Sequence, residues 1–80
     1  MNRFWEILGE RFNRHITKVE LVQAGGQTQV SVHAGAQKVG ACTDTYSECM
    51  NYLRNLHTSA PEGICKQAFA DACKSAGISL

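Results

Sequence analysis

Four cysteines and three histidines are the residues of this chain best suited to metal binding, redox chemistry or nucleophilic catalysis. The cysteines occupy positions 42, 49, 65 and 73, so six, fifteen and seven residues separate them. None of these gaps matches the short C-x2–4-C spacing with which one turn presents two thiolates to zinc. The spacing therefore predicts no metal site, and no other cofactor is expected.

Cys49, Cys65 and Cys73 fall on the apolar stripes of predicted helices, and Cys42 ends a predicted strand. Cys65 and Cys73 are two helical turns apart, roughly 12 Å at 1.5 Å per residue, so they cannot bond to each other. Free cysteine commonly acts as a small buried side chain, and we interpret all four in this way. The alternatives are one disulfide, from Cys49 to either Cys65 or Cys73, or a distorted metal site.

The histidines do not form a catalytic constellation. His15 and His57 lie near the ends of predicted helices, where a cation suits the helix dipole. Ser31 and His33 share one face of a predicted strand, but no third group is placed to orient them as a nucleophile and a base. We therefore predict that the protein is not an enzyme.

The composition indicates one small folded domain. Eighty residues leave no room for a second core, and 44% of them are hydrophobic. The formal charge of +1 is too small to indicate a nucleic-acid coat or a membrane-surface binder. No apolar run approaches the ~20 residues of a membrane span, and the charged N-terminus does not resemble a secretion signal. We expect a cytoplasmic protein with reduced thiols.

The N-terminal residues predict a helix over residues 2–14. Phe4, Leu8 and Phe12 recur every four residues with Trp5 beside them, and charged residues lie on the other side. The period then changes from four to two. In residues 28–34, Thr28, Val30, Val32 and Ala34 alternate with Gln29, Ser31 and His33, which is typical of a half-buried strand.

Two more strands flank this one. Residues 16–23 pair with it through the A-G-G-Q turn at residues 24–27, whose glycines can take positive φ. Val19 and Leu21 then face the core. Residues 37–42 continue as a third strand, in which we expect Val39 and Ala41 to point inward. Three consecutive strands predict an antiparallel meander.

Two capping boxes predict the remaining helices. Thr45 with Glu48 starts one helix, and Ser59 with Glu62 starts the last one, which ends near Gly77. The predicted fold is α+β, a three-stranded antiparallel sheet packed against helices in the order α-β-β-β-α-α. It forms a single domain over residues 1–80.

The polar side of this sheet is the predicted binding surface for another protein. Because the core does not need these residues, they are free to contact a partner, and an exposed edge strand offers a second mode of contact. Trp5 is an aromatic anchor that the core does not necessarily consume. We expect a monomer or a homodimer. The predicted partner-binding residues are Lys18, Glu20, Gln29, Ser31, His33, Lys38, Arg11, Arg14 and Trp5.

A nucleic-acid-binding module is the alternative. Helix, three strands and helix is also the element order of double-stranded-RNA-binding domains, and integrase-arm DNA modules use a similar sheet. Such modules need a basic footprint on phosphates. The basic residues here are few, and the last helix begins with neutral and acidic residues, so direct binding of nucleic acid is not expected.

The chain resembles the small phage-encoded anti-CRISPR proteins that inhibit type I systems. The resemblance rests on HITKVELVQAGGQTQVSV as a hairpin and on QKVGACTDTYSECMNYLRNL as a strand leading into a helix, with K-V-G-A at residues 38–41. It implies a non-enzymatic α+β protein of an infected bacterial host. Such a protein binds the crRNA-guided surveillance complex (Cascade) and blocks target-DNA binding or nuclease recruitment. The chain lacks the contact tyrosines of the similar inhibitors, so no contact residue is carried over.

Overall fold

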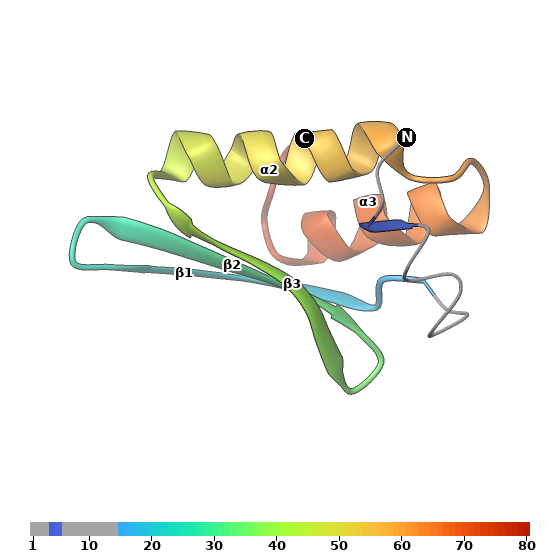
Figure 1. The fold of residues 1–80 in the computed structure, drawn as a ribbon, viewed down its shortest axis with the longest axis horizontal. Coiled ribbons are helices and arrows are strands. Elements are labelled where there is room, and N and C mark those ends of the chain that lie inside the picture. The colour runs from blue at the N-terminus through green and yellow to red at the C-terminus, as the bar shows by residue number, and fades with distance from the viewer. Residues whose placement is uncertain (1–3, 6–14) are drawn as a thin grey trace.

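Two helices cover one face of a three-stranded antiparallel sheet (Figure 1). The computed structural model describes residues 4–5 and 15–80. The α+β class and the antiparallel sheet are confirmed. The helix predicted over residues 2–14 lies outside the described residues, apart from Phe4 and Trp5, so the described order is β-β-β-α-α and not the predicted α-first order. The elements are β1 (Lys18–Ala24), β2 (Gln27–Ala34), β3 (Gln37–Asp44), α2 (Tyr46–Ser59) and α3 (Ile64–Ser75).

The β1–β2 hairpin has the turn and the faces that its sequence predicts. Gly25 and Gly26 take φ angles of 59° and 79°, the left-handed values that a tight hairpin turn requires. In the resulting register Val19 pairs with Val32. The residues of β2 that face the helices are all buried: Thr28, Val30, Val32 and Ala34.

β3 departs from the simple alternation predicted for it. A β-bulge at the pairing of Val32 and His33 inserts one extra residue, Val39, into β3. Val39 is half-buried against the core, as expected. The prediction that Ala41 points inward is wrong, because the bulge shifts the register: Ala41 is exposed on the far side, and Cys42 faces the helices.

The start of α2 has one of the two hydrogen bonds that make up a capping box. The Thr45 hydroxyl accepts from the Glu48 backbone N–H at 3.2 Å. The Thr45 N–H donates to Oδ1 of Asp44 at 2.7 Å. The Asp44 carboxylate therefore accepts the hydrogen bond that the Glu48 carboxylate would accept in a capping box.

The second predicted capping box is wrong. Ser59 is the last residue of α2, and its hydroxyl donates to the Asn55 carbonyl oxygen at 2.9 Å. α3 begins only at Ile64, after Gly63, and no side chain caps it. The Ser59 hydroxyl is satisfied by the helix that it ends, so it does not start the next one.

The core lies between the sheet and the two helices. α2 packs on β2 and β3, and α3 packs on β1. Leu53 of α2 and Phe69 of α3 are fully buried. Trp5 joins them: its ring meets Phe69 edge-on at 5.8 Å between centroids, and its Nε1–H donates to the Leu56 carbonyl oxygen at 2.8 Å.

Gly40 allows α2 to lie close to β3. A Cβ atom at this position would be 2.6 Å from the Tyr52 hydroxyl oxygen and 3.3 Å from Cε2 of Phe4. The absence of a side chain at this strand position therefore allows the Tyr52 hydroxyl to approach the backbone of β3.

Candidate functional site

A polar surface occupies the face of the sheet that points away from α2 and α3, and we call it the open face (Figure 1). Most of its side chains are exposed. Strand pairing arranges them in three rows: Lys18, His33 and Lys38; Glu20, Ser31 and Ala41; and Val22, Gln29 and Thr43. On β1 and β2 the face is built by period-two alternation, because the inward neighbours of these residues are held in the core.

Glu20 is the centre of an ionic network on the open face. Its carboxylate oxygens lie 2.8 Å from Nε2 of His33 and 3.6 Å from Nζ of Lys18. The Lys18 ammonium, and then the hydrogen bond to His33, hold the pKa of Glu20 below its usual value. The network joins β1 to β2, and it leaves the carboxylate ionised at neutral pH.

Thr17, just before β1, positions this network. Its backbone N–H donates to the His33 carbonyl oxygen at 2.9 Å, and its hydroxyl accepts from the Gly35 N–H at 2.9 Å. These bonds hold the end of β2 beside the start of β1, and therefore His33 beside Glu20. Nothing in the local sequence signals them, since they join residues sixteen and eighteen positions apart.

The structure brings six of the nine predicted partner-binding residues together on the open face: Lys18, Glu20, Gln29, Ser31, His33 and Lys38. Trp5 is not among them, because it is only 5% exposed and belongs to the core. Arg11 and Arg14 lie outside the described residues.

Three further residues of the open face were missed from the sequence. Val22 continues the alternation of Lys18 and Glu20 along β1, so the same pattern predicts its position. Ala41 and Thr43 are different, because only the bulge in β3 puts them on this side. Val22 is 56% exposed, and with the exposed Ala41 it adds apolar area to a mostly polar surface.

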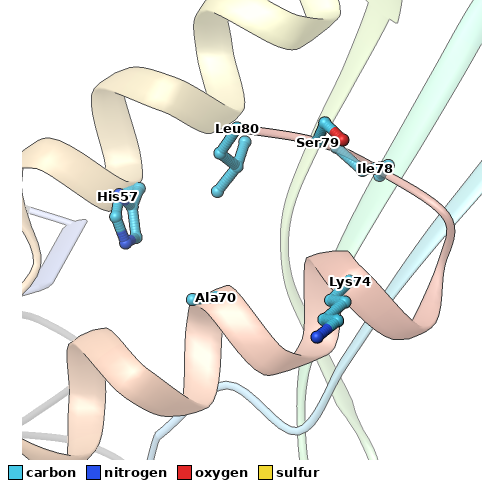
Figure 2. Close-up of a pocket in the computed structure, with 6 residues that line it drawn as sticks. All are labelled: His57, Ala70, Lys74, Ile78, Ser79 and Leu80. Carbon is cyan, nitrogen blue, oxygen red and sulfur yellow. The ribbon is translucent and has the colours of Figure 1, made fainter.

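A second surface feature is a depression of about 380 Å³ between the two helices and the C-terminal residues (Figure 2). Figure 2 shows the side chain of Leu80 pointing into it. The His57 ring is stacked against Phe69 at 6.1 Å between centroids, so this histidine packs on the core. The depression is lined by His57, Ala70, Lys74, Ile78, Ser79 and Leu80. His57 therefore has no Cys, Asp or Glu beside it in this lining.

All four cysteines are free thiols, and Cys49 and Cys73 are fully buried. Burial raises the pKa of the Cys73 thiol to about 11. The sulfur of Cys49 lies 3.7 Å from that of Cys42, a pairing that the sequence had not indicated. The sequence had suggested Cys65 or Cys73 as the disulfide partner of Cys49.

Among residues 4–5 and 15–80, no three or more His, Cys, Asp or Glu side chains gather in a way that would hold a metal ion. None of the helices described has both the length and the apolar character needed to cross a membrane. No family model, no curated protein and no solved structure matches the chain. The open face is therefore the basis on which a function is proposed.

Proposed function

We propose that this protein is a non-enzymatic binding protein that docks another protein against the open face of its sheet. The observation that carries the proposal is the exposed, ordered polar surface around Glu20, with its carboxylate set between Lys18 and His33. The contacts with Lys18 and His33 restrict the Glu20 side chain before a partner binds, which lowers the free-energy cost of ordering it on binding.

The charge of the open face favours a protein over a nucleic acid. Its two lysines and one glutamate give a formal charge of +1 with histidine neutral (two minus one). A phosphate-binding surface requires several uncompensated cations. The N-terminus of α2, where a helix dipole would attract a phosphate, instead carries Asp44 and Glu48.

The same residues define the chemistry of the partner surface. Gln29, Ser31 and Thr43 offer both donors and acceptors across the face, and Val22 adds an apolar contact. Lys38 is exposed at one end and suits a carboxylate. We expect the partner to present a flat polar surface with an apolar side chain over Val22 and an acidic one near Lys38.

The resemblance noted in the sequence provides a specific partner for this proposal. It is the crRNA-guided surveillance complex of a type I CRISPR–Cas system, in the cytoplasm of an infected bacterium. Bound there as a monomer or a homodimer, the protein would act in stoichiometric amounts by blocking target-DNA binding or nuclease recruitment.

The test uses a purified type I surveillance complex and three forms of the protein. Ser31→Arg places a long cation at the centre of the open face, and Asn55→Arg places the same side chain on the exposed side of α2 as a matched control. We expect the wild type and Asn55→Arg to bind the complex and reduce its binding of target DNA. Ser31→Arg should bind at least ~10-fold more weakly, equivalent to a loss of ~1.4 kcal/mol.

Equal binding by Ser31→Arg and the wild type would reject the open face as the docking surface. Absence of binding by the wild type would reject this partner. The nucleic-acid alternative is tested with duplex DNA and RNA, because the affinity of a phosphate binder falls steeply as the salt concentration rises from 50 to 200 mM. Nucleic-acid binding with that salt dependence, in the absence of any protein partner, would replace the proposal.

A further inference from the structure

Cys42 and Cys49 form a close pair of thiols where the sheet leads into the helical layer. Cys42 lies near the end of β3, and Cys49 lies in the first turn of α2. Their Sγ atoms are 3.7 Å apart, which is van der Waals contact with no other side chain between them. Seven positions separate them in the sequence, so neither strand nor helix periodicity predicts the contact.

The Cys49 thiol has one proton and three acceptors within reach: the Cys42 sulfur and two backbone carbonyl oxygens. The Cys49 thiol lies 3.4 Å from the Thr28 carbonyl oxygen and 3.6 Å from that of Cys42. Cys49 is fully buried on the side of α2 that faces the sheet. Cys42 is half-buried on β3, which is an edge strand of the sheet, so a small reagent reaches its sulfur first.

We propose that Cys42 and Cys49 are a redox-modification site that closes into an intramolecular disulfide when the protein meets a hydroperoxide. The bond requires an S–S distance of about 2.05 Å, so the two sulfurs must approach by roughly 1.7 Å. Side-chain rotation at two positions, with a small shift of the first turn of α2, supplies a movement of this size. The pair is therefore near the geometry of the product before any oxidant arrives.

The reaction has two steps. The Cys42 thiolate attacks one oxygen of hydrogen peroxide, the O–O bond breaks, and the products are a Cys42 sulfenic acid and hydroxide, which takes up the thiol proton as water. The Cys49 sulfur then attacks the sulfenic sulfur, the S–O bond breaks, and the departing hydroxide leaves as water with the Cys49 proton. Two thiols and one peroxide give one disulfide and two waters, with two electrons passing from sulfur to oxygen.

The electrostatics of the pair make this a slow reaction. Burial, and then the hydrogen bond to Cys49, raise the pKa of Cys42, and the carboxylates of Asp44 and Glu48 act in the same direction. Little thiolate is present at neutral pH. The site consequently responds to sustained oxidant and not to brief exposure.

The experiment treats the reduced protein, residues 1–80, with hydrogen peroxide, blocks the remaining thiols by alkylation and maps the tryptic peptides. Cys42 and Cys49 share one peptide, while Cys65 and Cys73 are on separate ones: residues 39–54, 55–66 and 67–74. We expect peptide 39–54 to lose two hydrogen atoms and to carry no alkyl group. The Cys65→Ser variant should give the same disulfide-containing peptide, whereas the Cys42→Ser variant should not form the disulfide.

Two outcomes would overturn the proposal. One is recovery of peptide 39–54 alkylated at both cysteines after prolonged oxidation, or a cross-link from Cys49 to Cys65 or Cys73 as the main product. The other is a melting temperature of the oxidised protein below that of the reduced protein, which would show that the bond does not fit the native structure. Neither result depends on any variant folding correctly.

Discussion

Replacement of Trp5 by phenylalanine is expected to lower the free energy of unfolding by about 2–3 kcal/mol. Trp5 is 5% exposed, and its Nε1–H donates to the Leu56 carbonyl oxygen at 2.8 Å. Loss of this buried hydrogen bond costs about 1 kcal/mol. The ring carbons that indole has beyond phenyl add roughly 1.6 kcal/mol, at about 0.8 kcal/mol per buried carbon.

A further penalty for an unsatisfied carbonyl is not included in this sum. The Leu56 carbonyl oxygen also lies 3.3 Å from the Ser59 hydroxyl, whose proton can turn to it from the Asn55 carbonyl oxygen. An 80-residue domain has a total stability of roughly 4–12 kcal/mol at ~0.05–0.15 kcal/mol per residue. The substitution therefore removes a substantial share of the stability and still leaves a positive free energy of unfolding.

Urea denaturation followed by far-UV circular dichroism measures the change, because Trp5 is the only tryptophan and its fluorescence is lost in the variant. In the wild type, its emission should be that of a buried indole and should shift to the red on unfolding. Tyr46→Phe is the matched control, since Tyr46 is 48% exposed and a surface change of this kind costs less than about 0.5 kcal/mol.

A loss of less than about 0.5 kcal/mol for Trp5→Phe would refute the reasoning. Emission typical of an exposed indole in the native protein would do the same. Either result would return Trp5 to the exposed partner-binding surface that the sequence predicted for it. The assay therefore distinguishes a core residue from an interface residue.

Three other substitutions test separate parts of the structure. Gly40→Ala should lower the free energy of unfolding by about 1–2 kcal/mol, because the new Cβ would lie 2.6 Å from the Tyr52 hydroxyl oxygen. Adding Tyr52→Phe removes that oxygen and should recover most of the loss, measured by urea denaturation. A double variant as unstable as Gly40→Ala alone would contradict this explanation. The pKa of Glu20 is lowered from its ordinary 4.5 mainly by Lys18, so the carboxylate contributes stability above pH 4.5 that is lost as the pH falls through the folded-state pKa. Glu20→Gln should accordingly flatten the melting temperature profile below about pH 5, and an unaltered profile would rule out the network as its source. Thr45→Ala should cost about 1 kcal/mol, because its hydroxyl accepts a backbone N–H of α2 at 3.2 Å; Thr45→Ser keeps that acceptor and should be nearly neutral by thermal denaturation.

The sequence by itself determined the hairpin and most of the open face. Alternation in β2 placed Gln29, Ser31 and His33 on one side because successive side chains of a strand point to opposite faces. The glycines of the A-G-G-Q turn determined the register of β1 against β2. Both are properties of residues close together in the chain, which is why local patterns were sufficient.

Only the tertiary structure decided the faces of β3 and the roles of Trp5 and the cysteines. The bulge at Val39 turns Cys42 towards the helices and Ala41 away from them. Cys42 thereby reaches Cys49, and Trp5 bonds to a carbonyl 51 residues away. Such contacts form because a sheet and two helices must exclude water and satisfy buried polar atoms together. The free energy of these contacts depends on residues that are distant in the chain, so no local sequence pattern predicts them.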